Sequence, residues 1–141
     1  MQMAGVSARQ YKGAGAYARI GMESKALSAS PHQLIVMLFD GARLAIRTAR
    51  LHMLNGHIEE KAKAISKALE IVNNGLLAAL DREQGGEVAT NLAALYDYIA
   101  RLLLQANLHN DAEKLTEAER LLADIDSAWR ELEGKIREGQ K

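Results

Sequence analysis

Four segments of this chain place apolar residues at alternating steps of three and four, the spacing that keeps side chains on one face of an α-helix. They span residues 31–54, 58–80, 86–108 and 112–136, and the connections between them are short. The single proline, Pro31, lies at the start of the first segment, so no later helix is interrupted by proline. Abundant Ala, Leu, Glu, Lys and Arg and few β-branched residues favour helix throughout. The sequence predicts an all-α chain.

Length and charge narrow the function classes. A chain of 141 residues suits one domain with a sizeable core. Its 18 basic and 18 acidic residues cancel, which gives no overall field toward nucleic acid or an anionic membrane. The absence of cysteine excludes disulfides, thiol catalysis and cysteine-based metal centres. No apolar run approaches the ~20 residues that span a bilayer, and the first ten residues lack a signal-type apolar stretch. We expect a cytoplasmic protein with no membrane insertion.

We expect two parts, a flexible N-terminal arm over residues 1–27 and a bundle over residues 28–141. Glycines are dense in the arm and disfavour stable helix there, although residues 16–27 allow a short extra helix. Two tyrosines, Tyr11 and Tyr17, lie in this arm. Aromatic side chains on a flexible segment can dock on a surface and leave it. The alternative is a tail whose tyrosines have no role.

The bundle begins with Ser30-Pro31-His32-Gln33, in which Ser30 and Gln33 form a capping box and Pro31 takes the first helical position. Short loops force sequential helices to lie antiparallel, which predicts an antiparallel up-down four-helix bundle. The expected core positions share one face of each helix. They are Leu34, Ile35, Leu38, Phe39, Ala42, Ala45, Ile46, Ala49 and Met53, then Ile58, Ala62, Ile65, Leu69, Val72, Leu76 and Leu80, then Val88, Leu92, Leu95, Ile99, Leu102 and Ala106, then Leu115, Ala118, Leu122, Ile125, Trp129, Leu132 and Ile136.

Residues 86–108 carry more apolar side chains than one core face needs. Tyr96, Leu103 and Leu104 fall outside the expected stripe and widen it. A helix that is apolar over much of its circumference carries a second contact surface or packs against two neighbours in the bundle. The spacing alone leaves both interpretations open.

The sequence lacks the motifs of the enzyme classes that helical bundles commonly support. A carboxylate-bridged metal pair needs Glu-x-x-His on two helices, and none of the four histidines follows a glutamate by three residues. His109 and Glu113 share a face but lie at a loop, and His52 is the sole candidate for phosphotransfer. No P-loop or nucleophile-elbow motif is present. We therefore expect no catalytic residue, no cofactor and no metal ligand.

A nucleic-acid interface would use the arginines at helical spacing, Arg43, Arg47 and Arg50. Basic residues elsewhere are mixed with acids, which argues against tracking of a phosphate backbone. We instead expect a solvated face beside glutamates of residues 58–80, and no nucleic-acid partner. An interaction protein is the class that remains.

Residues 30–42, SPHQLIVMLFDGA, resemble the Ser-Pro-x-x-Leu-Ile-x-Met-Leu-Tyr-Asp-Gly-Ala opening of the flagellin export chaperones of the FliS family. Residues 85–107 resemble the third long helix of that family. Tyr11 and Tyr17 match its N-terminal tyrosine arm, and Trp129 matches a late tryptophan. Phe39 departs from the family tyrosine and lacks its hydroxyl. Together these motifs cover essentially the whole chain.

The resemblance implies a non-enzymatic chaperone that binds the helical C-terminal segment of flagellin, prevents premature polymerisation and aids delivery to the flagellar type III export gate. It implies that the arm covers part of the groove and yields to flagellin. The implied flagellin-binding residues are Tyr11, Tyr17, Asn91, Tyr96, Ile99, Leu103 and Asn107. We expect Leu103→Ala to weaken binding with little change in melting temperature. The alternative is a helical scaffold for another partner, or a module that self-associates as a homodimer.

Overall fold

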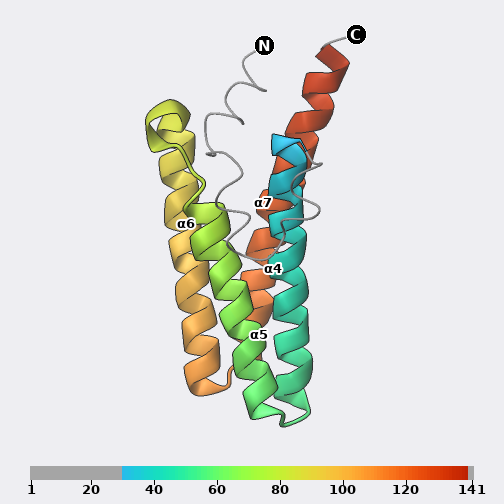
Figure 1. Cartoon of the computed structure of the whole chain (residues 1–141), viewed down its shortest axis with the longest axis vertical. Helices are drawn as coiled ribbons and strands as arrows, with labels where there is room; N and C mark the ends of the chain where they lie inside the picture. The colour runs from blue at the N-terminus through green and yellow to red at the C-terminus, as the bar shows by residue number, and fades with distance from the viewer. Residues whose placement is uncertain (1–29, 140–141) are drawn as a thin grey trace.

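A computed structural model describes the backbone of residues 30–139 and the side chains of residues 30–131. Its elements are α4 (Pro31–Leu54), α5 (Ile58–Glu70), the π-helix η1 (Ile71–Leu77), α6 (Arg82–His109) and α7 (Ala112–Gly139). Helix α4 packs against α5 and α7, and α6 packs against α5, η1 and α7 (Figure 1). The predicted all-α, up-down four-helix bundle is confirmed. The predicted arm over residues 1–27 lies outside the described residues.

Helix α4 follows its prediction from end to end. The Ser30 hydroxyl accepts a hydrogen bond from the Gln33 amide at 3.2 Å, and the Ser30 amide donates to the Gln33 side chain at 2.9 Å. This reciprocal capping box satisfies amides that the first turn of a helix leaves without partners. All nine expected core residues of α4 are buried. Trp129 is buried too, and its ring stacks on His32 at 4.7 Å between centroids.

The second predicted helix is not a uniform α-helix. It changes to π-helical turns over Ile71–Leu77, which contain Asn73-Asn74-Gly75. A π-turn accommodates an extra residue and shifts the register of the residues that follow. Ile58 is exposed and Leu69 half-buried, whereas Val72 and Leu76 are buried as predicted.

Helix α6 starts earlier than predicted and contains a break. Asp81 caps its first turn by accepting a hydrogen bond from the Gln84 amide at 3.1 Å. Gly86 then adopts φ 57° and ψ −134°, a left-handed conformation that glycine takes without a steric penalty. The predicted polar turn over residues 81–86 is therefore one helical turn followed by a kink. At the other end, the buried Lys61 ammonium donates to the Asn107 carbonyl and the Asn110 side chain, each at 3.2 Å.

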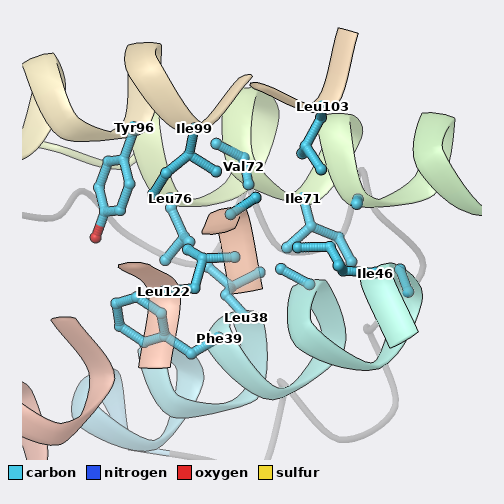
Figure 2. Packing of buried hydrophobic residues seen from close by; sticks show 14 of the residues in the cluster. Leu38, Phe39, Ile46, Ile71, Val72, Leu76, Tyr96, Ile99, Leu103 and Leu122 are labelled. Carbon is cyan, nitrogen blue, oxygen red and sulfur yellow. The ribbon is translucent and has the colours of Figure 1, made fainter. Parts of the chain in front are cut away.

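The face that α6 turns to the core agrees with the prediction at Ile99, Leu102 and Ala106 and differs from it earlier in the helix. The buried set is Gly85, Ala89, Ala93, Tyr96, Ile99, Ala100, Leu102, Leu103 and Ala106. Figure 2 shows Tyr96, Ile99 and Leu103 pointing toward side chains of η1 and α4. The expected core residues Val88 and Leu95 are exposed, and Leu92 is half-buried. That part of the prediction was wrong because the alanine side of the helix, one residue further along, packs inward instead.

Candidate partner-binding surface

A row of apolar side chains stays on the surface of α6 after the core is complete. Val88, Leu92 and Leu95 lie at steps of four and three on one side of the helix, and we call them the α6 ridge. Val88 is 50% exposed and Leu95 38% exposed, while Leu92 is half-buried. The residues that follow Val88 and Leu95, Ala89 and Tyr96, supply the core contacts of this part of the helix. Leu92 packs partly against the core, whereas Val88 and Leu95 leave apolar surface exposed, which is typical of a contact surface.

Polar groups border the ridge. Asn91 is exposed beside Leu95. The Tyr98 hydroxyl donates to a Glu117 carboxylate oxygen of α7 at 2.7 Å, and this hydrogen bond raises the pKa of Tyr98 above its ordinary value. Further along the same side of α6, Leu102 and Ala106 are buried. In Figure 1, α6 and α7 diverge away from the turn that joins them, toward the end that carries the ridge. The ridge therefore lies in the half of α6 that is farther from the turn to α7.

The structure places the residues of the expected receiving surface in different environments. Tyr96, Ile99 and Leu103 are fully buried in the core, so their side chains present no exposed surface to a partner in this structure. Asn91 is exposed and Asn107 half-buried. These two asparagines lie ~24 Å apart along α6 at 1.5 Å per residue, so they do not form one compact site. Tyr11 and Tyr17 lie outside the described residues. Flagellin binding by any of these residues stays a prediction.

Sequence reasoning did not single out a second exposed apolar set on the outer side of α4 and the start of α5. Its members are Leu44, Leu51, Leu54 and Ile58. Leu44 and Leu51 lie seven residues apart, about two helical turns, and fall between the core positions of α4. Their spacing in the sequence could therefore have indicated an exposed apolar row. Leu104 and Leu108 of α6 are exposed as well. The bundle thus leaves apolar surface on more than one side.

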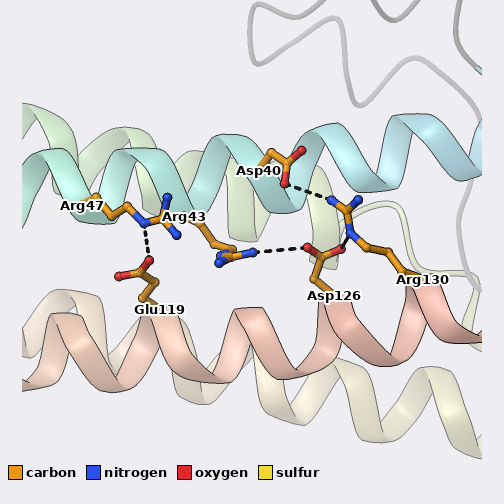
Figure 3. A network of polar contacts seen from close by, with 6 residues as sticks. All are labelled: Asp40, Arg43, Arg47, Glu119, Asp126 and Arg130. Atoms are coloured by element: carbon orange, nitrogen blue, oxygen red, sulfur yellow. Dashed lines mark hydrogen bonds and ion pairs between the residues drawn. The ribbon is translucent and has the colours of Figure 1, made fainter.

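The arginines of α4 are paired, which removes the basic face. Arg47 and Arg50 donate to the two oxygens of Glu119, and Arg43 contacts Asp126 at 3.4 Å. The partners lie on α7 and not on residues 58–80 as predicted (Figure 3). Partial burial raises the pKa of Glu119, but the hydrogen bonds from Arg50 and Arg47 outweigh it and lower the pKa below the ordinary glutamate value.

Asp126 is the buried carboxylate of this network. Arg130, one turn further along α7, donates to Asp126 at 2.9 Å and to Asp40 of α4 at 3.1 Å. The hydrogen bond to Asp126 raises the pKa of Arg130 further above its already high value. Burial of a carboxylate is costly unless hydrogen-bonded cations surround it. The network therefore joins α4 to α7, and its charged groups are paired with one another.

Within residues 30–131, no three His, Asp or Glu side chains gather in a way that could hold a metal ion. Over the described helices, none is both long and apolar enough to cross a bilayer.

The chain is similar to known proteins over most of its length. The family described as "Flagellar protein FliS" matches residues 13–136. The flagellar secretion chaperone FliS of Salmonella typhimurium strain LT2 is 54% identical over 123 residues, 87% of this chain and 91% of the relative. That of Escherichia coli K12 is 48% identical over 85% of this chain and 88% of its own length. That of Bacillus subtilis strain 168 is 35% identical over 74% and 76%. The chain belongs to the FliS family of flagellar secretion chaperones.

Proposed function

We propose that this protein binds the C-terminal helical segment of flagellin, keeps flagellin from polymerising before export, and helps deliver it to the flagellar type III export gate. Membership of the FliS family supports the chaperone role. The observation that carries the binding mode is the α6 ridge, apolar surface left exposed by a helix whose core face is already buried. Such a chaperone acts in the cytoplasm, ahead of export, and needs no catalytic group.

The ridge suits an amphipathic helix. Val88, Leu92 and Leu95 span ~10 Å, two turns of helix at 1.5 Å per residue. A partner helix lays an apolar face with anchors at steps of three and four against such a row. A segment that is unstructured alone folds as it binds, and part of the interaction energy is spent on its ordering. The exposed amide of Asn91 lies at the polar edge of this contact.

The remaining expected residues take different roles in this proposal. Tyr11 and Tyr17 cover part of the ridge in the free protein and give way to flagellin, which limits the apolar surface available for aggregation. Tyr96, Ile99 and Leu103 support the ridge from inside the core, where their burial places them. Asn107 is a contact for the far end of the bound segment.

A seeded polymerisation assay tests the proposal. The protein should suppress filament growth from flagellin monomers at equimolar ratio. Val88→Asp or Leu95→Asp places a charge in the apolar contact and should weaken suppression on the order of tenfold, which corresponds to a loss of about 1.4 kcal/mol of binding free energy. The matched control is Leu44→Asp, which alters a 63% exposed leucine on the outer side of α4.

Circular dichroism keeps the test interpretable, because every variant changes an exposed residue and should melt like the parent protein. Full suppression by folded Val88→Asp and Leu95→Asp proteins would exclude the α6 ridge as the flagellin site. Equal losses in the Leu44→Asp protein would show that the contact is not specific to α6.

A further inference from the structure

The turn between α4 and α5 holds two histidine rings against each other. The Nδ1 atoms of His52 and His57 lie 3.2 Å apart, and the ring centroids lie 5.4 Å apart with an interplanar angle of 46°. His52 is half-buried and His57 exposed, so solvent reaches the pair. Neither ring belongs to the core cluster or to the α6 ridge.

The backbone of the turn fixes this pair. The His57 amide donates to the His52 carbonyl at 2.9 Å, and the Gly56 amide donates to the Met53 carbonyl at 3.3 Å. Gly56 adopts φ +75°. These two bonds and the left-handed glycine form a Schellman motif, in which the residues at the positions of His52 and His57 touch, usually through apolar side chains. Here both positions are histidine, so the turn itself brings two imidazoles together.

The separation of the two nitrogens matches the span of a chelated metal ion. Imidazole nitrogens bind zinc at about 2.0–2.1 Å, and at that bond length two nitrogens 3.2 Å apart subtend about 100° at the metal. That angle lies close to the tetrahedral value. In the metal-free turn the two Nδ1 atoms lie at hydrogen-bond distance, with one ring as donor. Chelation by both Nδ1 atoms requires the donor ring to adopt the tautomer that carries its proton on Nε2, which leaves an Nδ1 lone pair on each ring for the metal ion. The terminal torsion of histidine is soft, so each ring can turn its lone pair toward a shared ion.

We propose that His52 and His57 form a two-histidine chelate for a borderline divalent transition metal, Zn²⁺ or Ni²⁺. Imidazole suits these ions, whereas carboxylate, carbonyl and water ligands suit Mg²⁺. No third His, Asp or Glu of the described residues joins the pair, so water completes the coordination and the ion exchanges freely. The bound ion ties the last turn of α4 to the start of α5 and stabilises the turn. The site is separate from the proposed flagellin surface.

The test uses the full chain without a histidine tag, freed of metal by a chelator that is then removed. Zinc or nickel chloride at 100 µM should raise the melting temperature by about 3 °C, because an ion that binds the native state alone stabilises it by mass action. Magnesium chloride should leave it unchanged. His52→Gln and His57→Gln should each abolish the rise. His109→Gln, which changes an exposed histidine at the end of α6, should retain it.

Nuclear magnetic resonance of the histidine rings gives a direct second readout. Zinc added up to 1 mM should move the ring signals of His52 and His57 together and leave those of His32 and His109 in place. The proposal is overturned if the two rings do not respond selectively, or if the rise in melting temperature survives His57→Gln. Neither result bears on flagellin binding, so the proposed function stands or fails separately.

Discussion

The Leu103 side chain is fully buried and points toward η1 and α4 in the core (Figure 2). Truncation to alanine removes its core contacts and leaves a cavity. We expect Leu103→Ala to lower the free energy of unfolding by about 2–5 kcal/mol, measured by urea denaturation. This replaces the expectation from the sequence that its melting temperature would hardly change.

The neighbouring residue supplies a matched control for that measurement. Leu104 is 57% exposed on the same helix, and Leu104→Ala should change the free energy of unfolding by no more than about 0.5 kcal/mol. If Leu103→Ala destabilised the protein no more than Leu104→Ala, the burial of Leu103 in solution would be contradicted. The pair isolates burial, because both changes remove the same atoms from the same helix.

Among the helices, α4 and α6 show why one register was predictable and the other was not. On α4 the expected stripe contains large and small apolar residues at unbroken steps of three and four, and all nine positions are buried. The exposed Leu44 and Leu51 lie outside this stripe. On α6 two stripes run one residue apart, Val88 and Leu95 against Ala89 and Tyr96. Hydrophobicity favours the first stripe, but alanines allow helices to approach closely, and the second stripe packs inward. Only the neighbouring helices decide between them.

Other features also depend on the assembled fold. The π-helical turns of η1 interrupt a regular three-four pattern, and spacing alone does not reveal them, although Asn73-Asn74-Gly75 marks the place. The acidic partners of Arg47 and Arg50 lie on α7, 69 to 72 residues away in sequence. The exposure of the α6 ridge follows from the register of α6. The capping box, in contrast, depends only on residues 30–33 and was predictable. The order of the helices was predictable as well, because short loops join them.

The contact between α4 and α7 makes stability depend on pH through Glu119. Its pKa is lowered below 4.5 in the folded protein by the hydrogen bonds of Arg50 and Arg47, against the opposing effect of burial. A carboxyl with a lowered pKa stabilises the fold fully above its unfolded pKa and loses that contribution as the pH falls through the folded pKa. Glu119→Gln should therefore be less stable than the parent at pH 7, with a smaller difference at pH 3.

Urea denaturation of both proteins at pH 7, 5, 4 and 3 measures that difference. Glu113→Gln serves as a control, since it alters an exposed carboxylate on α7. A stability difference between parent and Glu119→Gln proteins that stays constant from pH 7 to pH 3 would show that the ionised Glu119 does not stabilise the α4–α7 contact.

At the scale of the whole molecule, the described side chains divide into a buried core and exposed apolar surface. Buried side chains from α4, α5, η1, α6 and α7 form one continuous core. Val88 and Leu95 of the α6 ridge and Leu44 and Leu51 of α4 lie outside that core and are exposed, while Leu92 packs partly against it. A chaperone for an unstructured segment needs this division, because its fold must persist with the client absent and its surface must accept an amphipathic helix. The family and the helix order were predictable, whereas the position of the open surface required the packed structure.

The central claim is that flagellin folds its C-terminal segment onto the α6 ridge. Calorimetric titration of the full chain with that segment from the flagellin of its own organism tests it most directly. We predict one-to-one binding with a negative heat-capacity change and a gain in helicity, as for folding coupled to apolar burial, and weaker binding by Leu95→Asp. No heat and no gain in helicity at micromolar concentrations, with the bundle shown to be folded, would contradict the claim and favour another partner or a second copy of the chain.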